Sequence, residues 1–142
     1  MKELNCLVGD KLPKFKAGAL NGDILSNKNL LSSEFNLFNF WFIGCPPCIE
    51  ELDELNELKQ RSNLSILSFC RDSKEEIQNS DLDFSFPVVP AAGQLIEDVF
   101  AIPYGYPTNI LTDCRGRIIS VFLSIDKRYN SFAELDSIIG GL

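Results

Sequence analysis

The chain has 142 residues, of which 45% are hydrophobic and 23% charged, so a packed globular domain is expected and a disordered or fibrous chain is excluded. The formal net charge is −7 and the 13 Lys and Arg residues are spread out, which leaves neither a nucleic-acid footprint nor a basic membrane patch. No stretch approaches the roughly 20 apolar residues of a membrane span, and no signal peptide or anchor is recognisable. We expect a single domain, residues 1–142, large enough to fold without disulfides or metals.

The first half of the chain predicts a hairpin followed by a strand, a helix and a strand. Residues 14–27 are expected to form a β-hairpin, because the Asn-Gly pair within them accepts the positive φ values of a tight turn. Residues 37–43 are almost continuously apolar, as in a central strand covered on both faces. Apolar residues recur every three positions in a predicted helix that ends near Arg61, and residues 65–69 predict a second strand. These two strands should be parallel.

The second half of the chain predicts shorter elements. Residues 74–78 and 93–100 are expected to be helical and to form, with the segment between them, an insertion. Residues 108–112 and 117–123 flank a turn sequence that ends in glycine, which predicts an antiparallel hairpin. A Ser followed three residues later by Glu predicts a capped closing helix over residues 131–139.

Five cysteines, an odd number, cannot all pair within one molecule, and only Cys45 and Cys48 lie close together in the sequence. They fall in the stretch WFIGCPPC, where the central strand meets the following helix. The first turn of a helix has unpaired N–H groups and the positive end of the helix dipole, which stabilise a thiolate. Pro46 and Pro47 suit that first turn, because its nitrogens need no helical hydrogen bond. The pair is therefore expected to be a redox couple.

Other interpretations of the cysteines stay open. Free cysteines are commonly buried as small apolar residues, so an inert pair on a scaffold is one alternative. A closed zinc site needs four ligands, but the chain has one CxxC motif and no histidine, and Cys70 adds at most a third soft ligand. Copper(I) or another thiophilic metal, held by Cys45 and Cys48, is the metal alternative, whereas the redox function needs no cofactor. Cys70 is expected to be a buried inert thiol and Cys114 an exposed one, and Cys6 has no assigned role.

Three motifs in chain order resemble those of TlpA-like thiol-disulfide oxidoreductases, the thioredoxin-fold group that includes ResA. Residues 41–55, WFIGCPPCIEELDEL, resemble the signature WxxWCPPCxxExPxL. Residues 8–15, VGDKLPKF, resemble the opening VGxxLPxF, and residues 106–118 resemble the later PTxxLIDxxGxI. The resemblance covers most of the chain. It implies a thioredoxin-like three-layer α/β sandwich with a central mixed sheet, an N-terminal hairpin and the insertion around residues 74–100.

The resemblance also implies roles for individual residues. Cys45 would be the exposed nucleophile that attacks a substrate disulfide, Cys48 the resolving thiol, and Glu51 a carboxylate that exchanges a proton with Cys48. A second interpretation of Glu51 is a carboxylate that only complements the positive end of the helix. The bond between Tyr106 and Pro107 would be cis, and the backbone before Pro107 would pair with the substrate. The implied substrate-binding residues are Trp41, Gly44, Pro46, Tyr106 and Pro107.

Three positions depart from the family patterns, and one of them is Asp53, which stands where the signature has a helix proline, so that no kink is expected there. Gly44 stands where the second tryptophan of the signature is usual, which should widen the surface beside Cys45 and remove an aromatic contact. Asn39 stands where thioredoxins carry a buried aspartate. Since an amide cannot titrate, proton transfer would fall to Glu51 or to water.

The function implied by the resemblance is thiol-disulfide exchange with protein substrates, as a reductant or isomerase outside the cytoplasm of a bacterium, in the periplasm or cell envelope. Cytochrome c maturation is one pathway of this type. The implied partners are a disulfide-containing protein and a membrane electron donor that keeps the pair reduced. The chain is expected to be a monomer that binds no nucleic acid. The alternative enzyme is a thiol peroxidase, although peroxiredoxins carry Thr or Ser where this chain has Phe42.

Overall fold

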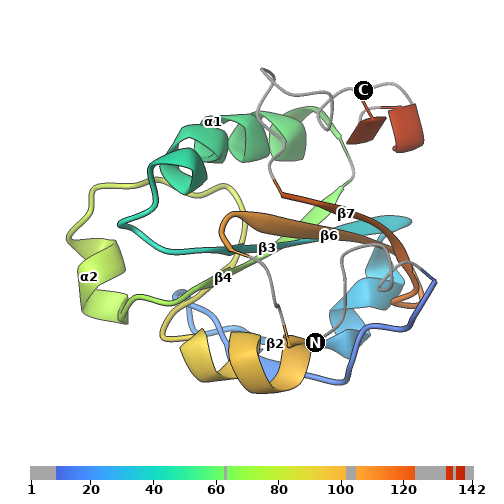
Figure 1. The fold of residues 1–142 in the computed structure, drawn as a ribbon, viewed down its shortest axis with the longest axis horizontal. Helices are drawn as coiled ribbons and strands as arrows, with labels where there is room; N and C mark the ends of the chain where they lie inside the picture. The colour runs from blue at the N-terminus through green and yellow to red at the C-terminus, as the bar shows by residue number, and fades with distance from the viewer. Residues whose placement is uncertain (1–8, 63, 102–104, 124–133, 136, 140–142) are drawn as a thin grey trace.

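The computed structural model describes residues 9–62, 64–101, 105–123, 134–135 and 137–139. Its centre is a five-stranded mixed sheet with the strand order β5-β4-β3-β6-β7 (Figure 1). The strands are β3 (Phe35–Trp41), β4 (Ser65–Cys70), β5 (Val88–Val89), β6 (Thr108–Asp113) and β7 (Ile118–Phe122). Strand β3 runs parallel to β4 and antiparallel to β6, so it joins the parallel and antiparallel halves of the sheet.

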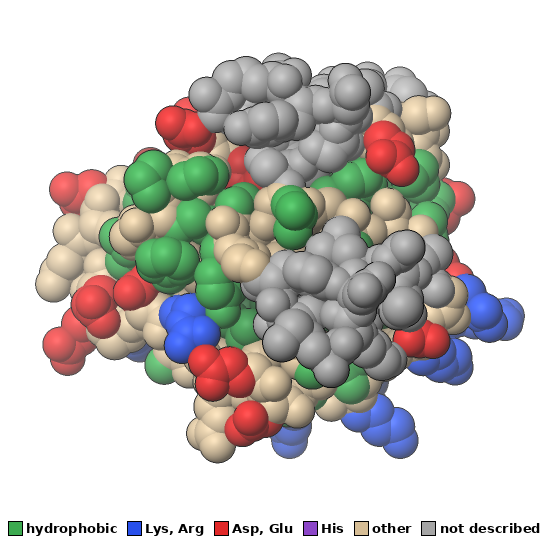
Figure 2. All heavy atoms as spheres, in the orientation of Figure 1, with side chains coloured by type: hydrophobic (Ala, Val, Ile, Leu, Met, Phe, Trp, Pro, Cys, Tyr) green, Lys and Arg blue, Asp and Glu red, His purple; other side chains and the backbone are tan. Residues whose placement is uncertain are grey.

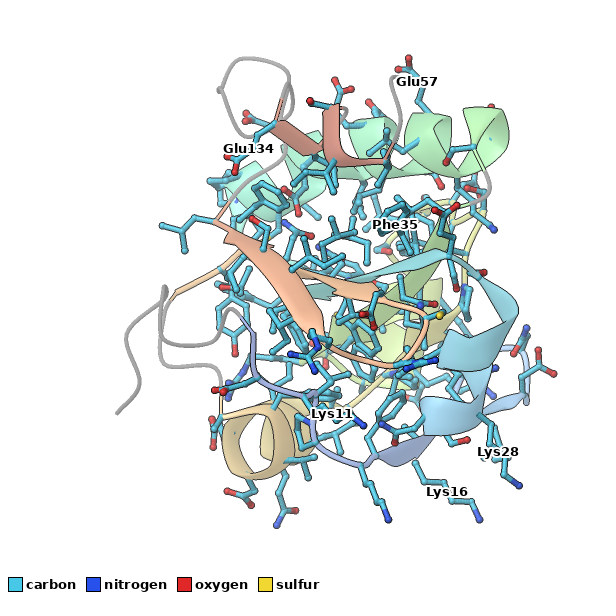
Figure 3. The ribbon with its side chains drawn as sticks, turned by 90° about the vertical axis from the view of Figure 1, so that its right-hand side faces the viewer. Lys11, Lys16, Lys28, Phe35, Glu57 and Glu134 are labelled. Carbon is cyan, nitrogen blue, oxygen red and sulfur yellow. A yellow bond between two sulfur atoms is a disulfide. The ribbon has the colours of Figure 1, made fainter. Side chains whose placement is uncertain are left out.

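The remaining elements cover the two faces of this sheet. They are the hairpin β1 (Lys16–Gly18) and β2 (Ile24–Ser26), the 3-10 helix η2 (Asn27–Ser32), the helices α1 (Pro46–Arg61) and α2 (Lys74–Gln78), and the π-helix η3 (Leu95–Phe100). Helix α1 covers one face, whereas η3 and the hairpin lie on the opposite side of the sheet (Figures 1 and 3). The predicted thioredoxin-like sandwich of three layers is thereby confirmed.

Two hydrophobic clusters hold the layers together, because the side chains of a strand alternate between its two faces. Leu37 and Trp41 of β3 belong to the cluster that includes Leu55 of α1. Phe40, on the opposite face of β3, belongs to a largely aromatic cluster, in which its ring centroid is 5.1 Å from that of Phe100 in η3. Strand β3 is therefore covered on both faces, as its almost continuous apolar sequence predicts.

Helix α1 begins directly at the cysteine pair. Cys45 is the N-cap residue, with φ −106° and ψ 99°, and Pro46 and Pro47 occupy the first helical positions. Proline suits these positions because their nitrogens have no helical hydrogen-bond partner and its fixed φ matches the helix. Further along, Leu55 and Leu58 are fully buried, so the apolar stripe of the helix packs on the sheet. The sequence thus places the cysteines at a helix N-terminus.

The predicted elements agree with the structure in the middle of the chain and differ at some ends. The N-terminal hairpin, the parallel strands around the long helix and the later antiparallel hairpin are confirmed. The central strand ends at Trp41 rather than at residue 43, because the N–H of Ile43 donates to the side chain of Asp72. The helix expected over residues 93–100 is π-helical from Leu95. The predicted closing helix lies partly outside the described residues, and the single domain stays a prediction.

Candidate active site

Cys45 and Cys48 form a disulfide at the junction of β3 and α1, with their Cα atoms 5.2 Å apart. The chain turns at this point because the N–H of Cys45 donates to the carbonyl oxygen of Phe42 at 3.2 Å. The N–H of Cys48, the first one after the two prolines, donates to Sγ of Cys45 at 3.3 Å. This N–H and the helix dipole are both directed at Cys45, an arrangement that stabilises its thiolate once the pair is reduced.

Both residues of the pair are largely shielded from solvent in the disulfide state. Cys45 is 5% exposed and Cys48 is 0% exposed. The expectation of an exposed Cys45 therefore needs correction, because the backbone of Tyr106 lies against its sulfur. Cys45 is still the more accessible of the two residues, which is the order that attack on a protein disulfide requires.

The start of β6 lies against the cysteine pair. The bond between Tyr106 and Pro107 is cis, as the resemblance implies, and Pro107 is buried. The carbonyl oxygen of Tyr106 is 3.6 Å from Sγ of Cys45. The hydroxyl of Thr108, the first residue of β6, donates to the carbonyl oxygen of Gly105 at 2.7 Å. The fold thus brings Cys45, Cys48, Tyr106 and Pro107 together at one end of the sheet.

An aromatic pair lies where the family pattern places a tryptophan. Gly44 is exposed, and a Cβ atom placed on it would lie 3.4 Å from the ring of Phe42. That ring packs edge-on against the ring of Tyr106, with 5.4 Å between the centroids. Compared with the tryptophan of the family signature, Gly44 is expected to widen the surface beside Cys45 and remove an aromatic contact. That expectation stays a prediction, and the structure adds that the Phe42 ring lies next to Gly44. Pro46 is exposed at the same end of α1.

Arg71 supplies a positive charge next to this aromatic pair. Its Nη1 atom donates to Oη of Tyr106 at 3.0 Å and forms an ion pair with Oε1 of Glu97 at 3.0 Å. The guanidinium carbon is 5.8 Å from the centroid of the Tyr106 ring. The bonds to Tyr106 and Glu97 raise the pKa of Arg71, so its side chain stays charged. Figure 2 shows hydrophobic side chains gathered around the start of α1, with a basic side chain beside them.

Trp41 lies within the core and not on the surface of the site. Its side chain is 0% exposed, its Nε1 atom donates to Oγ of Ser68 at 2.7 Å, and its ring is 5.7 Å from that of Phe84. The family resemblance implies a substrate-binding role for Trp41. Because Trp41 is fully buried, it cannot contact a substrate directly, and it packs in the core beneath the site.

Glu51 is fully buried on α1, one helical turn after Cys48, which is also 0% exposed. Its Oε1 atom accepts a hydrogen bond from Nδ2 of Asn39 at 2.9 Å. Nδ2 of Asn109 is 3.2 Å from Oε1 and 3.4 Å from Oε2. A carboxylate that only complemented the helix end would be expected to face solvent. Glu51 faces the sheet, on the side of the helix where Cys48 is buried.

Sequence reasoning missed three polar residues of this region. Asn109 and Ser68 are buried in β6 and β4, and a polar residue at an inward position of an apolar strand was the signal that could have identified them. Asp72 accepts a hydrogen bond from the backbone N–H of Ile43 at 2.6 Å, across 29 residues of sequence. No local pattern marks such a bond, because its partner is a backbone group on a distant segment.

The remaining described cysteines lie outside the pair. Cys70 is buried, and its burial raises the pKa of the thiol to about 12, as expected for an inert thiol. Cys114 is half-buried rather than exposed, and it lines a hollow with Leu30 and Arg115. Cys6 lies outside the described residues. Within the described part of the chain, no three or more His, Cys, Asp or Glu side chains form a group suited to a metal ion.

The chain is similar to curated proteins named thiol-disulfide oxidoreductase ResA. It is 29% identical over 125 residues to the proteins of this name from Bacillus thuringiensis subsp. konkukian (strain 97-27) and Bacillus cereus (strain ATCC 10987 / NRS 248), with 83% of this chain and 70% of each relative covered. The ResA of Bacillus anthracis is 27% identical over 118 residues, covering 79% of this chain and 67% of the relative. No protein-family model matches the chain.

Solved structures share the fold over nearly the whole chain. A Chlorobium tepidum protein described as a thiol:disulfide interchange protein DsbE has a TM-score of 0.75 at 17% identity, with 92% of this chain and 95% of that chain covered. A thiol-disulfide oxidoreductase from Bacteroides fragilis NCTC 9343 has a TM-score of 0.68 at 25% identity, covering 91% of this chain and 99% of that one.

The fold is that of the thioredoxin-like solved structures, and the chain, with its Cys45–Cys48 disulfide, is similar to curated thiol-disulfide oxidoreductases. Within that class, the curated proteins to which the chain is similar are named ResA. Among the residues whose structure is described, no helix is both long enough and apolar enough to cross a membrane.

Proposed function

We propose that this chain exchanges its dithiol and disulfide with protein substrates, as a reductant or isomerase that works outside the cytoplasm of a bacterium. The observation that carries the proposal is the disulfide between Cys45 and Cys48 at the start of α1, with the carbonyl oxygen of Tyr106 3.6 Å from Sγ of Cys45. A disulfide at this position is suited to exchange, because the helix end stabilises the thiolate formed when the bond opens. The location outside the cytoplasm follows from the family resemblance.

In the proposed cycle, the reduced enzyme starts with Cys45 as a thiolate and Cys48 as a thiol. Sγ of Cys45 attacks one sulfur of the substrate disulfide, and the other substrate sulfur leaves as a thiolate. Cys48 then loses its proton, attacks the Cys45 sulfur of the mixed disulfide and releases the second substrate thiolate. Two electrons have passed to the substrate, and the pair has returned to its disulfide form. A membrane thiol-disulfide donor would supply two electrons, and the uptake of one proton would restore the Cys45 thiolate and the Cys48 thiol.

The substrate is proposed to lie along the exposed end of the sheet beside the cysteine pair. Gly44, Pro46 and Gly105 are exposed there, and the Tyr106 side chain is half-buried. An extended substrate segment would pair with the backbone just before Pro107, as the family resemblance implies. Such a pairing would bring a substrate disulfide to Sγ of Cys45, since the Tyr106 backbone already contacts that sulfur.

Trapping of mixed disulfides tests the proposed function. Cys48→Ser keeps the nucleophile but lacks the resolving thiol, so mixed disulfides with a protein substrate should accumulate. Cys45→Ser should form none. Cys70→Ser is the matched control, because Cys70 is a free, fully buried thiol, and it should behave as the wild type does. Equal trapping by Cys45→Ser and Cys48→Ser would contradict the proposal.

The equilibrium reduction potential tests the preferred direction of exchange. A reductant is expected to have a potential near that of thioredoxin, about −270 mV, whereas a disulfide donor would lie near about −120 mV. The measurement is made against glutathione, with Cys6, Cys70 and Cys114 changed to Ser so that only the Cys45 and Cys48 couple reports. A potential at the oxidising end of this range would show that the chain is a disulfide donor and not a reductant.

A further inference from the structure

The buried carboxyl group of Glu51 lies at the end of a row of polar side chains that crosses the sheet. In neighbouring strands, Ser68 of β4 is in register with Asn39 of β3, and Asn39 is in register with Asn109 of β6. Ser68, Asn109 and Glu51 are 0% exposed and Asn39 is 1% exposed. Burial of polar groups costs free energy unless they are hydrogen-bonded, so each side chain of the row needs a partner.

The chemistry of these side chains sets the direction of each hydrogen bond. The indole Nε1 of Trp41 only donates, and it lies 2.7 Å from Oγ of Ser68. Ser68 therefore accepts from Trp41 and turns its own proton to Oδ1 of Asn39, at 2.9 Å. Because Oδ1 of Asn39 is the acceptor in that bond, its Nδ2 is the group that donates to Asn109 and to Glu51, each at 2.9 Å.

Asn109 continues the same direction. Its Oδ1 atom accepts from Asn39, so its Nδ2 atom faces Glu51, 3.2 Å from Oε1 and 3.4 Å from Oε2. Two amides thus direct three N–H contacts at one carboxyl group. An ionised carboxylate accepts at both oxygens, whereas a protonated one loses acceptor capacity at one of them. Donors aligned in this way also polarise one another, which strengthens the bonds at the end of the row.

We propose that Asn39 and Asn109 are positioning residues that hold Glu51 as a carboxylate, ready to take the proton of the Cys48 thiol. This inference rests on the proposed function. In the step, the S–H bond of Cys48 breaks, the proton moves to an oxygen of Glu51, and the Cys48 thiolate attacks the mixed disulfide at Cys45. The proton leaves with the released substrate thiolate, so Glu51 returns to its ionised state. The amide at position 39 does not titrate, and it acts through Glu51.

A small aromatic disulfide whose released thiolate is coloured separates the two steps of exchange. The reduced protein, with Cys6 and Cys114 changed to Ser, releases the first thiolate when Cys45 attacks and the second when Cys48 resolves the mixed disulfide. The second phase should speed up with pH as Glu51 ionises. In Asn109→Ala the pH midpoint of the second phase should move about one pH unit higher, because a donor to the carboxylate is lost. Below the midpoint, the second phase should therefore be about tenfold slower. The first phase should not change.

Asn36→Ala is the matched control. Asn36 is also a fully buried amide on β3, but its Nδ2 atom donates to the carbonyl oxygens of Leu30 and Asp113. In Asn36→Ala the second phase should keep the pH midpoint of the parent protein. If Asn109→Ala and Asn36→Ala have the same midpoint, the inference is wrong, while a first phase that still requires Cys45 leaves the proposed function standing. Loss of both phases in the parent protein would instead overturn the proposed function.

Trp41 provides a second readout that does not depend on exchange. It is the only tryptophan of the chain, and its indole is the first donor of the row. The fluorescence of the oxidised protein should show a pH transition that Glu51→Gln abolishes and that Asn109→Ala moves to higher pH. If Asn109→Ala does not fold, Asn109→Asp keeps the shape, removes the donor and should move the transition in the same direction. A transition that Glu51→Gln leaves intact, or no transition, would overturn the inference.

Discussion

Sγ of Cys45 lies 3.6 Å from the carbonyl oxygen of Tyr106, although 61 residues separate them in the sequence. The antiparallel pairing of β3 with β6 produces this contact, because it sets Phe40 opposite Thr108 and so brings the two strand ends together. The contact joins the helix that stabilises the thiolate to the segment proposed to hold the substrate. Substitutions next to Cys45 or next to Tyr106 should therefore change the rate of thiol-disulfide exchange more than they change the free energy of unfolding.

A substitution of Gly44, next to the nucleophile, tests how closely the aromatic pair of Phe42 and Tyr106 is packed. Gly44→Trp restores the family pattern and adds a large side chain beside the ring of Phe42, since a Cβ atom there would lie 3.4 Å from that ring, in van der Waals contact. We expect kcat/KM for reduction of a protein disulfide to fall, and Phe42→Ala to restore part of it in the double variant. The coupling between the two positions should be about 1 kcal/mol, or about fivefold. Equal losses in Gly44→Trp and in the double variant would contradict this packing.

The positive charge of Arg71, beside this aromatic pair, predicts a preference among substrates. Arg71 touches Tyr106 and lies in a chain of net charge −7, so it should favour a disulfide flanked by acidic residues. Arg71→Ala should lower kcat/KM for an acidic peptide disulfide about threefold, less at high salt, and should not lower kcat/KM for a basic peptide disulfide, because a repulsive charge is removed. Arg117→Ala, which removes an exposed arginine outside the site, serves as the control. Equal losses for both peptides would show that Arg71 does not select by charge.

Much of the fold could be predicted from the sequence, because its signals are local. The three-residue apolar spacing in α1 and the apolar run of β3 reflect burial patterns that a single segment already contains. The cysteine spacing, together with the two prolines, located the redox pair at a helix start. The end of β3 was not predictable, because it depends on the bond from Ile43 to Asp72, which lies on another segment.

The polar row beneath the site shows what local signals leave out. Asn39 stands out in the sequence because thioredoxins carry a buried aspartate at its place, but its partners depend on strand register. Asn109 lies 70 residues further along the chain, and only the pairing of β3 with β6 sets the two amides side by side. The burial of Glu51 against both amides likewise requires the packing of α1 on the sheet. Register and helix packing are tertiary properties, so no local pattern contains them.

The hydrogen bond between Asp72 and Ile43 should stabilise the segment that joins β3 to Cys45. Oδ2 of Asp72 accepts from the N–H of Ile43 at 2.6 Å, in a half-buried setting. Asp72→Ala removes this acceptor and should lower the free energy of unfolding by about 1 to 3 kcal/mol. Asp72→Asn keeps an acceptor oxygen and should lose less. Urea unfolding of the oxidised protein measures both variants, and the same loss in each would show that the hydrogen bond is not the cause.

The buried thiol of Cys70 predicts a fall in stability at alkaline pH. Burial raises the pKa of this thiol from its ordinary value of 9.0 to about 12, so the folded protein keeps a proton that the unfolded chain loses between these values. Because the unfolded state binds fewer protons in this window, the free energy of unfolding decreases as pH rises through it, by up to about 1.4 kcal/mol per pH unit. Below pH 9.0 the contribution is intact.

Urea unfolding of the oxidised protein between about pH 8 and about pH 10.5 measures this effect, since the disulfide keeps Cys45 and Cys48 from titrating. Cys70→Ala is the comparison, because it removes the thiol but keeps every other group that ionises in this range. Its loss of packing lowers stability by a constant amount, whereas the slope assigned to Cys70 should disappear. The difference between the two proteins should therefore shrink as pH rises. Parallel curves would mean that the Cys70 thiol ionises alike in the folded and unfolded states.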